Sequence, residues 1–378
     1  MDFIDGQKAM FPEMGASYDG MGELYQQKLW HQLSVMLYDF LFVKENCRGS
    51  SFHDLYVNFI RKFDTRVNQV ILAQLACFVA TTLPAPAPAI EFLESVLENR
   101  VRLGPEASMV LDMDIVKLKV ILGSVADAKV LLEEGKEKIS KELASSESVV
   151  FSKFYGAETE YRKAVGPPQE FYKSGLMLLV YTPSDKMPPD ERYVLATDMA
   201  IAAMTADEVY NFGEVLATPI LAALDGTPNQ WMRDMVVAMN NGSIAEFNTI
   251  VDTKKDSYYA QPALASRHEV VKQKLLLLAL INMASKMHSH DRIVPFTKIA
   301  ETCMTPIDQV EWVLMRAMSL KLIKGSIDEV QQAVEITWVV PRVLDVSKIS
   351  ALGVQMNQWG NKVKDMLVNL EDQTVEIC

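Results

Sequence analysis

The histidines are the residues of this chain with the clearest potential for chemistry. Only five occur among 378 residues, and two of them, His288 and His290, are separated by one serine and followed by Asp291. Such a pair could bind zinc, although a zinc hydrolase needs a third ligand and an open coordination position. In a His-x-His metalloprotease motif a serine and an aspartate follow at fixed distances, and here those positions hold Lys298 and Glu301. An ammonium group in place of the hydroxyl opposes metal binding. We therefore interpret the segment as a polar loop after a long helix, and keep a metal-dependent isopeptidase as the alternative.

Other catalytic patterns find no support. The chain has neither a glycine-rich phosphate-binding loop nor a GxSxG nucleophile turn. Its four cysteines are scattered, which favours neither a disulfide framework nor a zinc module: Cys47, Cys77, Cys303 and Cys378. We expect Cys303 to be buried in an apolar helix and unreactive. The adjacent acids Asp328 and Glu329 indicate a solvated turn rather than an acid/base pair. We thus predict no catalytic residue, no metal and no cofactor.

Composition limits the possible partners. Apolar residues make up 49% and charged residues 23% of the chain, as in a folded globular protein. The net charge of −12 argues against binding to nucleic acid or to an anionic membrane. The longest apolar run, Leu275–Ile281, is too short to span a bilayer, and the N-terminus lacks the pattern of a signal peptide. We expect a soluble protein of the cytoplasm and nucleus.

The first half of the chain has the periodicity of a helical-repeat arm. We predict a loose lead-in over residues 1–20 and an arm over 21–170, beginning with a helix that carries Leu24, Leu29, Leu33, Leu37 and Phe40 on one face. Short breakers, among them Pro84–Pro88 and Gly166-Pro167-Pro168, separate the helices that follow. These are expected at Asp54–Phe63, Asn68–Leu83, Ala89–Arg102, Ser108–Leu122, Ala126–Lys141 and Ser148–Val165. Successive helix pairs without a strict period predict a degenerate α-solenoid of tetratricopeptide type.

A second helical block is predicted over residues 171–290, after a loop at Thr182–Asp190. Its helices are expected at Glu191–Met204, Asn211–Leu224, Gln230–Asn240 and Ser243–Lys255, with a long one within Ala263–Ser285.

Residues 291–344 have the order of a winged helix, namely strand, helix, helix and hairpin. The strands are predicted at Ile293–Phe296, Leu322–Ile327 and Val334–Val339, and Thr305 is expected to cap the second helix. Between Ile293 and Pro341 four basic residues face six acidic ones, a net charge of −2. Carboxylates in the first turns of the second helix would repel phosphate, so we favour protein binding and keep a nucleic-acid regulator as a further alternative.

The last segment, predicted as a helix over 345–372, carries an uninterrupted heptad seam. Apolar residues recur at alternating spacings of three and four, as in coiled coils: Ile349, Leu352, Met356, Trp359, Val363, Met366 and Leu370. Such a narrow apolar stripe needs partner helices on one side. We predict that these seven residues form a partner interface.

Several stretches resemble the PCI family, whose members build the proteasome lid, the signalosome and a translation initiation factor. The resemblance covers nearly the whole chain and is most specific in the wing, Lys324–Val330, and in Trp338 with Pro341–Asp345. Further similar stretches are Glu23–Tyr25, Lys28–Leu33 and Asn211–Glu214. Within the family the chain resembles the subunits of the proteasome lid.

The resemblance implies a mainly α fold: an α-solenoid, then a PCI module ending in a winged helix with a small β-hairpin, then a bundling helix. It also implies a non-catalytic scaffold that supports lid assembly and ubiquitin-dependent degradation. Its expected partners are other PCI-type lid subunits and the deubiquitinase and ubiquitin-receptor subunits of the lid, in a hetero-oligomer. In the winged helix, Lys324, Ser326, Asp328 and Glu329 are the candidate contact residues.

Overall fold

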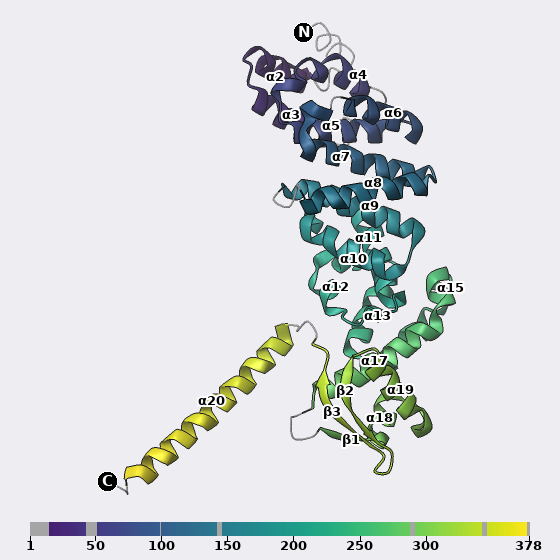
Figure 1. Ribbon diagram of the computed structural model, residues 1–378, viewed down its shortest axis with the longest axis vertical. Helices are drawn as coiled ribbons and strands as arrows, with labels where there is room; N and C mark the ends of the chain where they lie inside the picture. Colours follow the sequence, from purple (N-terminus) through teal and green to yellow (C-terminus); the bar gives the residue numbers. More distant parts are fainter. Residues whose placement is uncertain are drawn as a thin grey trace. The chain divides into compact units, whose positions relative to one another are not determined.

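The computed structural model describes residues 15–42, 51–98, 100–141, 146–287, 292–341 and 346–375. Helices dominate these ranges, and none of them is long and apolar enough to cross a membrane (Figure 1). The chain divides into two compact units, Met1–Lys186 and Met187–Cys378. The mainly α fold predicted from the sequence is confirmed.

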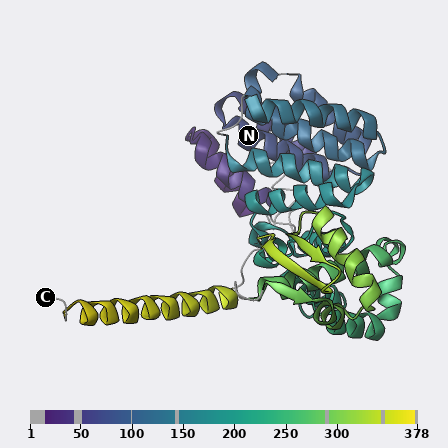
Figure 2. The same ribbon diagram turned by 60° about the horizontal axis from the view of Figure 1, so that its bottom comes forward.

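Unit 1 is a helical array in which helices that follow one another in the sequence pack together, as its blue and teal helices show in Figure 2. Helix α7 lies against α5, α6, α8 and α9, and α9 lies against α10. The helices are α2 (Gly15–Gln26), α3 (Trp30–Phe42), α4 (Ser51–Asn58), α5 (Gln69–Thr82), α6 (Pro86–Leu97), α7 (Arg100–Ile121), α8 (Val125–Lys141), α9 (Ser148–Val165) and α10 (Pro168–Tyr181), with 3-10 helices at Ile60–Lys62, Asp64–Arg66 and Ser184–Lys186.

The start of the arm differs from the prediction in two ways. Helix α2 begins at Gly15, inside the segment predicted to be a loose lead-in, and it buries Tyr18 and Met21. The single helix expected from Leu24 to Phe40 is broken, because Lys28 takes a left-handed conformation with φ 59°. The Trp30 ring, at the start of α3, then stacks on Phe63 with ring centroids 5.7 Å apart.

Two further boundaries are corrected. The proline-rich segment Pro84–Pro88 is not a linker throughout, since α6 starts at Pro86; proline is compatible with a first helical turn, where the N–H groups have no intrahelical acceptor. Helix α10 was not predicted; it lies in unit 1, which ends at Lys186. The apolar periodicity predicted the bounds of α9 correctly. The Asn68 side chain caps α5 by accepting a hydrogen bond from the Val70 N–H (2.9 Å).

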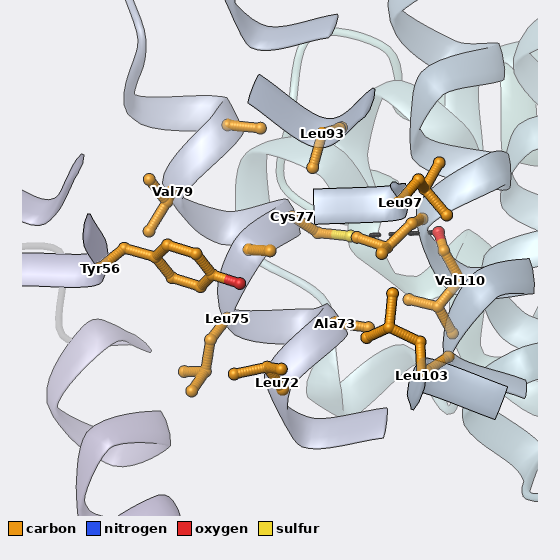
Figure 3. Packing of buried hydrophobic residues seen from close by; sticks show 14 of the residues in the cluster. Tyr56, Leu72, Ala73, Leu75, Cys77, Val79, Leu93, Leu97, Leu103 and Val110 are labelled. Carbon is orange, nitrogen blue, oxygen red and sulfur yellow. Dashed lines mark hydrogen bonds between the residues drawn. The ribbon is translucent and has the colours of Figure 1, made fainter. Parts of the chain in front are cut away.

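The core of unit 1 combines apolar packing with a partly buried ion pair. Figure 3 shows Cys77 of α5 among leucine and valine side chains, with its thiol directed at the Val110 carbonyl. Nearby, Lys153 Nζ lies 2.7 Å from a carboxylate oxygen of Asp114. Burial by itself raises the pKa of Asp114, but the ammonium groups of Lys153 and Lys117 lower it overall. The pair joins α9 to α7.

The helical part of unit 2 surrounds the long helix α17. Its elements are α11 (Pro189–Thr205), α12 (Gly213–Ala217), a 3-10 helix at Pro219–Leu224, α13 (Gln230–Asn241), α14 (Ile244–Thr253), α15 (Lys255–Tyr259), α16 (Pro262–Ser266) and α17 (His268–Ser285). The helix predicted at Asn211–Leu224 is thus interrupted, whereas the long helix predicted within Ala263–Ser285 is confirmed as α17.

Two basic side chains close the C-terminal end of α11, where the last carbonyls lack intrahelical partners. Lys274 Nζ donates to the carbonyls of Ala203 (2.6 Å) and Ala206 (2.8 Å), and Arg267 donates to that of Thr205 (3.0 Å). The sequence alone gave no indication of this contact between α11 and α17.

A winged helix follows, in the predicted order. It consists of β1 (Ile293–Pro295), α18 (Phe296–Cys303), α19 (Ile307–Ser319), β2 (Ile323–Asp328) and β3 (Ala333–Val339). The three strands form an antiparallel sheet in the order β1-β3-β2. The predicted cap of α19 is wrong: the helix starts one residue after Pro306, and the hydroxyl of Thr305 is buried without a hydrogen-bond partner.

Helix α20 (Val346–Val375) ends the described part of the chain and is the yellow helix in Figure 1. It contains the whole predicted heptad segment.

Candidate functional site: the C-terminal helix and the wing

The seam of α20 is exposed to solvent. Its seven residues keep between 45% and 68% of their accessible surface. Every other side chain described between Ile349 and Leu370 is exposed as well. A long helix with an apolar stripe is marginal when alone in water, because most helical stability comes from covering such a stripe. The seam is therefore an apolar face that no described part of the chain covers.

Glycine widens the apolar face on one side. Gly353 and Gly360 are seven residues apart and follow Leu352 and Trp359, and nothing lies within 4 Å of the position of an added Cβ at either glycine. Leu367 occupies the next equivalent position and is 54% exposed. A helix packed on this side can come close to the backbone, and a broad face suits a bundle of several helices better than a two-stranded coiled coil.

The four candidate residues of the winged helix lie together at the outer strand of the sheet. Lys324, Ser326 and Asp328 alternate along β2, so their side chains share one face, and Glu329 follows in the turn; all four are exposed. Lys324 Nζ lies 5.0 Å from the centre of the Trp338 ring, and Asp328 accepts a hydrogen bond from the Gln331 N–H (3.0 Å). In the described sheet β2 pairs only with β3, which leaves its other edge open.

Several exposed apolar residues of the winged helix were missed by the sequence reasoning, and two of them are the most exposed. Val330, at the tip of the hairpin, is 96% exposed, and Trp312 on α19 is 73% exposed. Trp312 could have been recognised, because it lies opposite the inward face formed by Val310, Leu314 and Ala317. Val330 had no periodic pattern to indicate its exposure.

A metal site requires several ligating side chains that lie close together. Within the described ranges, no three or more His, Cys, Asp or Glu side chains are grouped so that they could hold a metal ion. His288, His290 and Asp291 lie outside the described residues. Cys303 is buried as predicted, and its burial raises the pKa of the thiol to about 11, so the reactive thiolate is disfavoured.

Comparison with known proteins connects this architecture to a family. Residues 17–236 match the family described as PSD13 N-terminal repeats, and residues 246–338 match the PCI domain. Helix α20 lies beyond both matched ranges.

Three curated relatives align with almost the whole chain. They are 26S proteasome non-ATPase regulatory subunit 13 homolog B of Arabidopsis thaliana (32% identical, covering 100% of this chain and 98% of the relative), 26S proteasome non-ATPase regulatory subunit 13 of Dictyostelium discoideum (30%, 100% and 98%) and probable 26S proteasome regulatory subunit rpn9 of Schizosaccharomyces pombe (30%, 97% and 94%).

Proposed function

The chain belongs to the family of 26S proteasome non-ATPase regulatory subunit 13, and on that premise we propose that it is a non-catalytic structural subunit of the regulatory-particle lid. In this role it supports lid assembly and so ubiquitin-dependent degradation. Likeness over the full length to proteasome subunits favours the lid over the signalosome and the initiation factor, the related complexes that also contain PCI subunits.

The observation that carries this proposal is the exposed seam of α20. Complete burial of one large apolar side chain contributes about 1.5–3 kcal/mol, so covering seven half-exposed ones contributes about 7 kcal/mol before the cost of association. That amount is enough to hold a helix in a bundle. We assign the seam to a bundle with helices of sister subunits, and the wing residues Lys324, Ser326, Asp328 and Glu329 to contacts with neighbouring winged helices.

The finer assignments follow from the same proposal. The partners are other PCI-type lid subunits, and through them the deubiquitinase and ubiquitin-receptor subunits, in a hetero-oligomer of the cytoplasm and nucleus. The acidic character of the chain, with a net charge of −12, supports protein partners over nucleic acid.

The test is a double substitution in the seam, Trp359→Asp with Val363→Asp. Both side chains are exposed, at 68% and 47%, so the isolated chain stays folded while two charges enter the proposed bundle. We expect the variant to be lost from affinity-purified lid. Gln358→Asp with Asn361→Asp, which adds the same charge to the polar side of the helix, is the matched control and should assemble normally. Normal co-purification of the seam variant would refute the proposed bundle.

A further inference from the structure

A cavity opens between α4 and α6 in unit 1. Its volume is about 550 Å³, within the range of ligand sites in proteins. Tyr56 and Val57 of α4 form one wall and Phe92 and Val96 of α6 the other. None of these residues belongs to α20 or to the winged helix, so the cavity is separate from the surfaces already described.

The inner part of the cavity is apolar. Leu72 of α5 and Leu103 of α7 line it and are only 3% and 6% exposed, and Phe92 and Val96 are half-buried. An aliphatic or aromatic side chain entering from outside would be removed from water on these surfaces. The cavity therefore favours an apolar group.

Tyr56 supplies a polar group that lacks a partner. The residue is 5% exposed, and its hydroxyl makes no hydrogen bond to another described residue. Figure 3 shows its ring between Val79 and Leu75 of α5. Burial, assisted by the nearby Asp64 carboxylate, raises the pKa of the Tyr56 hydroxyl, so the group stays protonated and can donate. A peptide carbonyl in the cavity can accept a hydrogen bond from this hydroxyl.

The charges at the rim are mainly negative. Glu91 of α6 is exposed and forms no ion pair with a described residue. Glu91 lines the cavity, and Asp64 lies in its other wall, where Arg61 is the opposing charge. A ligand carrying positive charge beside its apolar group is complementary to this rim, whereas a phosphate-rich ligand is repelled.

We propose that this cavity binds a short segment of a partner protein that presents an apolar side chain next to a lysine or arginine. The apolar side chain fills the space over Leu72 and Leu103, the Tyr56 hydroxyl donates to a backbone carbonyl of the segment, and the basic side chain lies along Glu91. The site goes beyond the proposed role in the lid, since it recognises a linear segment rather than a helix in a bundle.

The test uses random heptapeptides displayed on phage and selected against the full chain. Two variants alter the cavity: Ser95→Trp fills it from the exposed side of α6, and Glu91→Lys reverses the charge at its rim. Ser140→Trp and Glu134→Lys make the same changes at exposed positions of α8 that do not line the cavity. Circular dichroism establishes that all four variants are folded, and Glu91→Lys keeps the test decisive if Ser95→Trp unfolds the arm.

We expect the selected sequences to share an apolar residue next to lysine or arginine. Synthetic peptides of those sequences, followed by fluorescence anisotropy, should bind the chain at least tenfold more weakly after Ser95→Trp or Glu91→Lys and within twofold of the original affinity in the two controls. The proposal is overturned if no sequence is enriched, if the enriched sequences are acidic, or if both cavity variants bind as the unmodified chain does. A failed bundle test with α20 would leave these outcomes unchanged.

Discussion

Replacement of Lys274 by methionine removes the buried amine that closes the end of α11. The side chain is 2% exposed, and its Nζ donates to the carbonyls of Ala203 and Ala206 while lying 4.9 Å from the centre of the Phe212 ring. Methionine fills a similar volume but cannot donate, so both carbonyls lose their partner. An unsatisfied buried group costs about 1–3 kcal/mol, and two give a loss of about 2–5 kcal/mol in the free energy of unfolding.

Urea unfolding measures this loss. The fluorescence of Trp231, which is buried in the same unit, reports the transition. Lys272→Met on the same helix is the matched control, because Lys272 is half exposed and its 3.9 Å ion pair with Glu269 is worth less than about 1 kcal/mol. A loss below about 1 kcal/mol for Lys274→Met would show that the two carbonyls do not depend on the amine.

The same variant predicts a pH dependence. Burial lowers the pKa of Lys274 to about 7, from a usual value of 10.5. Between these two pH values the unfolded chain holds a proton that the folded chain has released, so stability rises with pH, by at most about 1.4 kcal/mol per unit from this group. The stability difference between the original chain and Lys274→Met should therefore grow from pH 7 to pH 9. A difference that is independent of pH would refute the lowered pKa.

Three other predictions can be checked on the purified chain. Asp114→Asn leaves the partly buried ammonium group of Lys153 without its carboxylate and should lower the free energy of unfolding by about 1–3 kcal/mol at pH 7. Since the pKa of Asp114 is lowered in the fold, the difference between the two proteins should disappear as pH falls below 4. Gly325→Ala places a Cβ against the backbone of β3 and should reduce the thermal midpoint, whereas Gly353→Ala, in open space on α20, should raise the helicity seen by circular dichroism. We expect elemental analysis of the purified chain to find no stoichiometric zinc. One zinc per chain that is lost after His288→Ala would overturn the non-catalytic assignment.

Helices with a clear apolar period were predictable, and their interruptions were not. Ser148–Val165 was located by its periodicity alone, whereas the break at Lys28 has neither glycine nor proline to mark it. That break lets the Trp30 ring stack on Phe63, a contact between residues more than thirty positions apart. A stretch with high helix propensity can leave the helical conformation where a tertiary contact offsets the cost of the break.

The two candidate surfaces, the seam of α20 and the cavity of unit 1, also differ in how far the sequence predicts them. The seven residues of the seam could be placed on one helix from the sequence, because they obey one period, and their role as an interface stays a prediction. The cavity of unit 1 was not, since its walls come from α4, α5, α6 and α7 and no motif links them.

The sequence by itself determined which side chains share a helix face, the acidic balance of the chain and the order of elements in the winged helix. Only the tertiary structure decided which of those faces are covered: α5 buries its apolar residues in the core, while the seam of α20 remains in water. The physical reason is that a helical period fixes the direction of each side chain relative to its own axis. Whether that direction meets solvent or another helix depends on contacts between distant parts of the chain.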